Sequence, residues 1–111
     1  MALVRLSAPE AMAAEPVAQL GDCTLYATAP AMPDGGSATA DERMATIQEI
    51  KSFQGALNEY RACLSAIAEN EELEIEAREA ALEEYNRTVE VETKMVEDWQ
   101  KFDKKFKKAN K

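Results

Sequence analysis

The clearest pattern in the chain is a series of apolar residues spaced alternately by three and four positions. Its members are Ile50, Phe53, Leu57, Tyr60, Leu64 and Ile67. This spacing places the side chains on one face of a helix and is typical of coiled-coil-like packing. Upstream, Thr39 is followed three residues later by Glu42, the spacing of a capping box in which each side chain satisfies a free amide of the first turn. We therefore predict a helix over residues 40–69.

The apolar spacing does not continue after residue 70, because the next positions of the same series are Glu71, Glu74 and Arg78. One unbroken helix would be about 105 Å long with a charged gap in its middle. We therefore predict a turn over residues 69–72, which no Gly or Pro marks, and a second helix over residues 72–109. Its expected inward positions are Leu82, Tyr85, Val89, Met95, Val96, Trp99, Phe102 and Phe106.

The two helices predict an all-α fold, an antiparallel coiled-coil-like hairpin. Residues 20–38 contain two prolines and the pair Gly35-Gly36, which is typical of an extended or irregular segment that is neither helix nor strand. Part of the shared face of the hairpin is expected to be covered by this segment, and the rest by a second copy or a partner. The covering side chains would be Leu20, Leu25, Tyr26 and Met32.

Residues 1–19 have two interpretations. Ala11-Met12-Ala13, before Ala14, has the small-x-small form of a signal-peptidase site, which favours the remnant of an export signal. The preceding "MALVRLSAPE" is short and polar for the apolar part of such a signal, which favours an Ala-rich disordered terminus instead.

The chain contains two cysteines, Cys23 in the irregular segment and Cys63 in the first predicted helix. An even cysteine count in a small chain of exported appearance favours a disulfide, and joining the two closes a loop worth about 4 kcal/mol in the chain-entropy model. The alternative is a pair of reduced thiols in a cytosolic protein. We predict that the bond forms, that it ties the irregular segment to the helix, and that the protein is periplasmic or secreted.

Composition argues against several function classes. Histidine is absent, which excludes His-based catalytic triads and His-ligated metal sites. The net charge of −8 argues against nucleic-acid binding, and no apolar run is long enough for a transmembrane helix. The glutamates of residues 71–84 include helical pairs that could share a hard cation, but we favour a solvated face. We expect no enzymatic activity, no cofactor and no metal.

The charge is unevenly distributed. Six basic and eighteen acidic residues precede Lys94, whereas seven lysines and three acidic residues follow from that position onward. In this last stretch three aromatic residues share one face of the predicted helix, and lysines surround that face. This pattern is typical of a helix that binds in the groove of an acidic partner or on an anionic lipid surface. The alternative is that the aromatic rings close the hairpin. The candidate partner-binding residues are Trp99, Phe102, Phe106, Lys101, Lys104, Lys105 and Lys108.

Residues 20–110 resemble an uncharacterised family of small periplasmic helical-hairpin proteins from Gram-negative bacteria. The matching elements are a cysteine before "PAMPDGGSATADERM", the segment "EYRACL", and "EEYNRTVE" ahead of an aromatic and basic helix end. The resemblance implies export, a disulfide and a hairpin, and it carries no known activity. Relatives are expected to have a proline-bearing turn between the helices, which this sequence lacks.

These observations predict a non-enzymatic exported helical protein that acts by binding, as an accessory subunit or interaction protein of a cell-envelope complex. The expected partner is a protein of the envelope or a second copy of the chain. The alternative is an envelope-surface binder that uses its basic aromatic C-terminal helix on lipid or on an anionic polymer.

Overall fold

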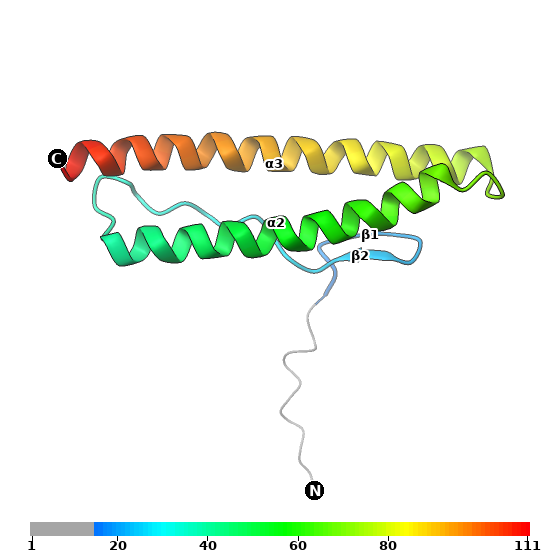
Figure 1. Cartoon of the computed structure of the whole chain (residues 1–111), viewed down its shortest axis with the longest axis horizontal. Coiled ribbons are helices and arrows are strands. Elements are labelled where there is room, and N and C mark those ends of the chain that lie inside the picture. Colours follow the sequence, from blue (N-terminus) through cyan, green and yellow to red (C-terminus); the bar gives the residue numbers. More distant parts are fainter. Residues whose placement is uncertain (1–14) are drawn as a thin grey trace, which may run out of the picture.

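Two long helices dominate the computed structural model, which describes residues 15–111 (Figure 1). Helix α2 spans Ala40–Glu69 and helix α3 spans Ile75–Ala109. They run antiparallel and pack along their lengths, which confirms the predicted all-α hairpin. Residues 1–14, where most of the predicted signal remnant falls, lie outside the described range.

Helix α2 begins where the capping box predicts. The Thr39 hydroxyl accepts a hydrogen bond from the Glu42 backbone amide at 3.0 Å, and the Glu42 carboxylate accepts one from the Thr39 amide at 2.8 Å. Four positions of the predicted apolar face are buried at 3% exposure or less: Phe53, Leu57, Tyr60 and Leu64. The two end positions, Ile50 and Ile67, are only partly buried against this core.

The turn between the helices is made by Asn70 without a glycine or proline. Its backbone amide donates to the Ile67 carbonyl at 3.2 Å, and its side-chain oxygen accepts from the Glu72 amide at 3.0 Å. The Arg78 guanidinium donates to the Ala68 carbonyl at 3.0 Å, which satisfies one of the free carbonyls at the end of α2. Helix α3 therefore begins at Ile75, three residues later than predicted.

The inward face of α3 matches the prediction in part, since Met95 and Phe102 are buried and Tyr85, Trp99 and Phe106 are partly buried. Its buried positions are Ala81, Thr88, Met95 and Phe102, which follow one another at intervals of seven residues. Leu82, Val89 and Val96, which were expected to face inward, are 53%, 44% and 38% exposed. Each lies one residue after a buried position and is therefore rotated about 100° away from the core.

The segment before α2 contains two short strands, which corrects the expectation of a segment without strands. Strands β1 (Ala18–Leu20) and β2 (Cys23–Leu25) pair antiparallel through a turn whose Gly21 has a φ of 58°. This φ is accessible to glycine at little cost. Cys23 and Leu25 point to the same side and are buried, whereas Tyr26, also expected to cover the hairpin, is 60% exposed.

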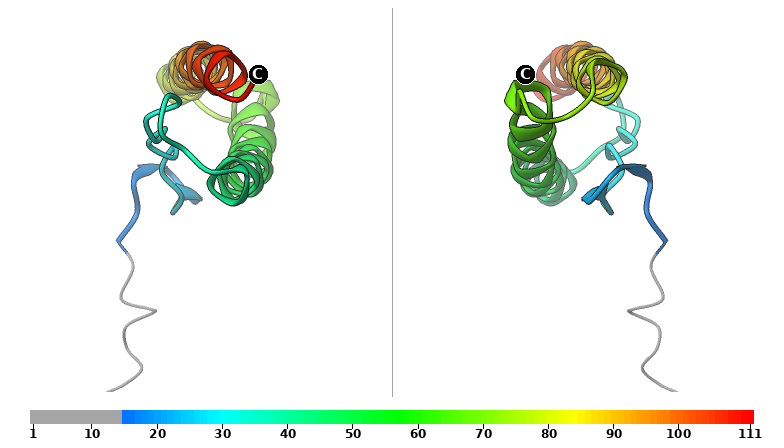
Figure 2. Two further views of the ribbon diagram at one scale, coloured as in Figure 1. Left: turned by 90° about the vertical axis from the view of Figure 1, so that its left-hand side faces the viewer. Right: turned by 90° about the vertical axis from the view of Figure 1, so that its right-hand side faces the viewer.

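A disulfide joins Cys23 to Cys63 of α2, as predicted, with the two Cα atoms 5.6 Å apart. Leu20, Ala27 and Met32 pack partly buried against the same core. The end-on views in Figure 2 show the result: residues 15–39, which we call the N-terminal segment, lie against one side of the helix pair and leave the opposite side uncovered.

Candidate functional site

The aromatic residues Trp99, Phe102 and Phe106 at the end of α3, together with Arg43 of α2, form a contact between the two helices that we call the aromatic junction. Phe102 is 3% exposed, and its ring lies 5.3 Å from that of Trp99 and 6.1 Å from that of Phe106. The Arg43 guanidinium of α2 lies 5.3 Å from the Trp99 ring and 5.5 Å from the Phe106 ring. All three rings thus take part in contacts within the hairpin, and Phe102 offers no surface to a partner.

Asp103 completes this junction. Its carboxylate accepts a hydrogen bond from the Arg43 side chain at 2.8 Å and forms an ion pair with Lys107 at 3.1 Å. The Arg43 hydrogen bond holds the pKa of Asp103 below its usual value, against the opposing effect of burial. The predicted lysines Lys101, Lys104, Lys105 and Lys108 are all exposed around this end.

The uncovered side of the hairpin, which we call the open face, has an apolar hollow of about 330 Å³ near the lysine-rich end. Residues of both α2 and α3 line it. Its apolar lining is Ile47, Ile50, Met95, Val96 and Trp99. Trp99 therefore belongs to this hollow as well as to the aromatic junction.

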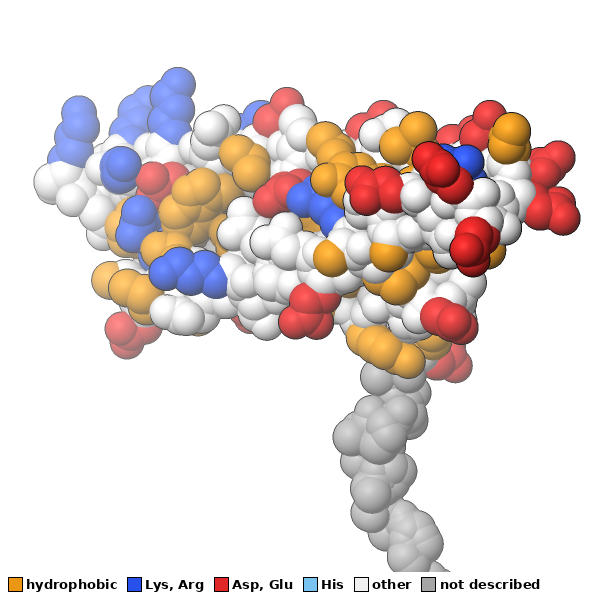
Figure 3. Space-filling model, turned by 45° about the vertical axis from the view of Figure 1, so that its right-hand side comes forward, with side chains coloured by type: hydrophobic (Ala, Val, Ile, Leu, Met, Phe, Trp, Pro, Cys, Tyr) orange, Lys and Arg blue, Asp and Glu red, His pale blue; other side chains and the backbone are white. Residues whose placement is uncertain are grey.

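A second, shallower apolar area lies on the open face near the turn. Leu82 and Ile75 of α3 meet Ala68 of α2 there, beside the polar side chains of Arg78 and Glu79. Ile75 and Leu82 are 63% and 53% exposed, although both are large aliphatic residues. In Figure 3 the hydrophobic side chains form separate patches along the two helices, with Arg and Glu side chains between them.

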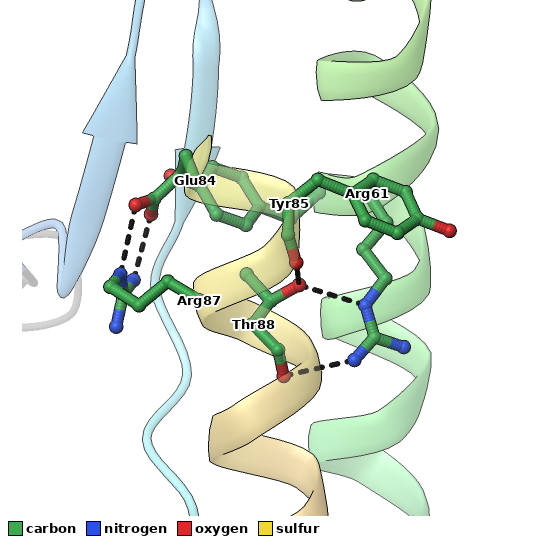
Figure 4. A network of polar contacts seen from close by, with 6 residues as sticks. Arg61, Glu84, Tyr85, Arg87 and Thr88 are labelled. Carbon is green, nitrogen blue, oxygen red and sulfur yellow. Dashed lines mark hydrogen bonds and ion pairs between the residues drawn. The ribbon is translucent and has the colours of Figure 1, made fainter. Parts of the chain in front are cut away.

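Arg61 of α2 occupies the middle of the open face. Its guanidinium donates to the side-chain and backbone oxygens of Thr88, each at 2.9 Å (Figure 4). It also forms an ion pair with Glu92 at 2.8 Å. The same guanidinium lies 5.9 Å from the Tyr85 ring, and Gln54 donates to Glu92 at 3.1 Å. This network bridges α2 and α3 and satisfies the buried Thr88 hydroxyl, which also donates to the Tyr85 carbonyl.

A further polar group lies on the side of α3 that faces the N-terminal segment (Figure 4). The Tyr60 hydroxyl donates to Glu84 at 2.6 Å, and Arg87 donates to both Glu84 oxygens at 2.7 and 2.8 Å. Burial, and then the hydrogen bond to Glu84, raise the pKa of Tyr60 to about 12. The Arg87 hydrogen bonds lower the pKa of Glu84, although burial acts in the opposite direction.

The exposed apolar residues of α3 form a regular series. Ile75, Leu82, Val89 and Val96 are separated by seven residues each, and we call them the exposed stripe. Seven residues correspond to two helical turns, so the four side chains lie in a row along the helix. The row passes beside both apolar patches of the open face, because Val96 belongs to one and Ile75 and Leu82 to the other.

Within residues 15–111 no group of three or more acidic or cysteine side chains is arranged to hold a metal ion, and the glutamates at positions 71–76 are exposed. Neither described helix combines the length and apolar character needed to cross a bilayer.

Comparisons with protein-family models, with curated proteins and with solved structures find no match to this chain. The case for a site therefore rests on the geometry of the chain itself. Sequence analysis placed the candidate surface at the C-terminal aromatic residues and did not single out Ile47, Arg61 or the exposed stripe. The signal for the stripe was present as the seven-residue spacing of Ile75, Leu82, Val89 and Val96.

Proposed function

We propose that the protein is a small exported interaction protein, an accessory subunit of a cell-envelope complex, that binds through its open face. One observation carries the proposal: a row of large aliphatic side chains on α3 stays exposed while the hairpin has a complete core of its own. Apolar side chains repeated at heptad spacing on a helix suit packing against another helix.

The disulfide supports the exported location. Such bonds persist in oxidising compartments and are rare in the cytosol, and here Cys23 is 1% exposed within the core. A bond in that position serves the fold rather than redox exchange with a partner, since a reactive cysteine has to be reachable.

The open face suits a protein partner better than the C-terminal aromatic residues do. Phe102 is buried, and the Trp99 and Phe106 rings are in contact with Arg43. By contrast, Leu82 and Val89 on α3 have half of their surface exposed and no role in the core. Removing them from water on binding would be favourable by about 25 cal/mol for each Å² of apolar area buried.

The experiment compares a tagged wild-type chain with the Leu82→Glu variant after chemical cross-linking in the cell envelope. The matched control is Val17→Glu, which changes an apolar residue of similar exposure, 48%, in the N-terminal segment. We expect one stoichiometric companion, either another protein or an untagged copy of the chain, with the wild type and the control and none with Leu82→Glu. The same companions with all three chains would contradict binding through the open face.

A second candidate function rests on the exposed lysines at the end of α3. Lys101, Lys104, Lys105 and Lys108 surround that end, and an anionic lipid or polymer would be attracted to them. We expect reversal of these four charges to abolish binding to vesicles that contain anionic lipid, and binding by the wild type to disappear as salt is raised. Wild-type binding that persists in 1 M salt would contradict an electrostatic contact.

A further inference from the structure

The exposed stripe is centred on a point in the N-terminal half of α3. Leu82 and Val89 lie on either side of the midpoint between Tyr85 and Asn86, and Ile75 and Val96 lie at equal distances further out. When two such helices lie antiparallel about a two-fold axis at this midpoint, each residue of the stripe faces another residue of the stripe. A surface that matches itself in this way is what an interface between identical subunits requires.

The charges of α3 favour the same arrangement. From Ile75 to Thr93 the helix has six acidic and two basic residues, and from Lys94 to Ala109 it has three acidic and six basic residues. Two parallel copies would place like charges side by side. In the antiparallel register residues 75–96 of the two copies overlap, and the lysine-rich residues 97–109 of each copy extend past the interhelical turn of the other. Glu71, Glu72 and Glu74 are exposed at that turn, so the two ends attract.

The partly buried positions beside the stripe agree with this register. A second row at seven-residue intervals lies on the side of α3 that contacts α2, and its members are Arg78, Tyr85, Glu92 and Trp99. In the antiparallel arrangement Arg78 of one copy lies opposite Glu92 of the other, and the two Tyr85 rings lie close to the axis. The pairing therefore joins unlike charges and places aromatic rings together.

We propose that a second copy of this chain docks on the open face, with the two α3 helices antiparallel along the exposed stripe. The inference rests on the proposed function, because it names the partner of the same face. Leu82 of each copy packs beside Val89 of the other, and Ile75 packs beside Val96. The two N-terminal segments then lie on the outer sides of the dimer, away from the axis.

The first test measures the mass of the full oxidised chain by sedimentation at several concentrations. We expect the wild type and the Val17→Glu control to be dimers, and Leu82→Glu or Val89→Glu to weaken the dimer at least about 100-fold, since each dimer would bury two unpaired carboxylates. Circular dichroism and thiol titration should show that the variants keep their helices and their disulfide, because both positions are exposed. A monomeric wild type at about 100 µM, or a dimer that Leu82→Glu leaves intact, would overturn the proposal.

The second test determines the direction of the helices with a short bismaleimide cross-linker. Asn86→Cys lies beside the axis and should cross-link to its own copy. Ile75→Cys should not, because its two copies would be roughly 32 Å apart at 1.5 Å per residue, but it should cross-link to Val96→Cys when the variants are mixed. Self-linking of Ile75→Cys would overturn the antiparallel order.

These outcomes separate the inference from the function on which it rests. A monomeric wild type that still captures a different envelope protein, and loses it on Leu82→Glu, overturns the homodimer and leaves the proposed binding face in place. A dimer that depends on Leu82 supports both.

Discussion

At the scale of single residues, buried polar groups of this hairpin have well-placed partners. Tyr60 is 2% exposed and its hydroxyl donates to Glu84, while Arg61 provides the hydrogen bond that the buried Thr88 hydroxyl accepts. A polar group without a partner would cost about 1–3 kcal/mol in such a position. These two groups therefore help to fix the register between α2 and α3.

The Tyr60 hydrogen bond should make stability depend on alkaline pH. The pKa of Tyr60 is raised from 10.0 in the unfolded chain to about 12 in the folded protein, so its contribution is fully present below pH 10 and is lost as the pH rises through 12. We expect Tyr60→Phe to lower the free energy of unfolding by about 1–2 kcal/mol at pH 8. The difference from the wild type should shrink between pH 10 and pH 12.

Urea unfolding followed by circular dichroism measures this difference at each pH. The control is Tyr26→Phe, at an exposed position, which should match the wild type throughout. A Tyr60→Phe difference that stays constant up to pH 12 would show that the hydroxyl contributes nothing through its proton.

At the scale of elements, features set by neighbouring residues could be predicted from the sequence, whereas features set by packing between the two helices could not. The start of α2 follows from Thr39 and Glu42 alone, because a capping box involves only neighbouring residues. The inward face of α3 was mispredicted at Leu82, Val89 and Val96 because two of its core positions, Ala81 and Thr88, are small or polar. Size and hydrophobicity pointed instead to the neighbouring Leu82, Val89 and Val96, which the fold leaves exposed.

Substitution of two glycines, Gly35 and Gly55, by alanine should change the stability of the fold in opposite directions. A Cβ on Gly35 would lie 2.8 Å from the Lys105 Cβ and would also meet the Phe102 carbonyl, so Gly35→Ala should force the loop away from α3 and destabilise the fold by about 1–3 kcal/mol. Gly55 lies within α2 with nothing near its Cβ position, so Gly55→Ala should stabilise the fold by about 1 kcal/mol. Thermal unfolding of the two variants checks both signs, and a stabilising Gly35→Ala would show that the loop does not pack closely on α3.

At the scale of the whole molecule, the sequence indicated the hairpin, the disulfide and an incompletely covered face. The side on which the N-terminal segment lies could not be read from the sequence, because it depends on where Cys63 points after α2 and α3 have packed. The same holds for the open face, which exists only as the side that this segment leaves free. The exposed C-terminal lysines, in contrast, follow directly from composition.

Removal of the disulfide should lower the stability of the whole molecule. The bond joins residues 40 positions apart, and loss of that loop constraint costs about 4 kcal/mol in the chain-entropy model. We expect a reductant, or the double change Cys23→Ala and Cys63→Ala, to shift the urea midpoint downward by a corresponding amount. Reductant should have no further effect on the double variant, and an unchanged wild-type midpoint after reduction would contradict a stabilising role.

The disulfide also determines how the molecule would respond to mechanical force. A chain pulled from its two ends transmits tension through the bond, so the segment from Cys23 to Cys63, which are 40 positions apart, forms a closed ring that does not extend. Breaking the bond would release at most roughly 130 Å of additional length, at about 3.3 Å per residue. Helix α3 lies outside the ring, so tension would peel it from α2 while the bond holds the N-terminal segment to α2.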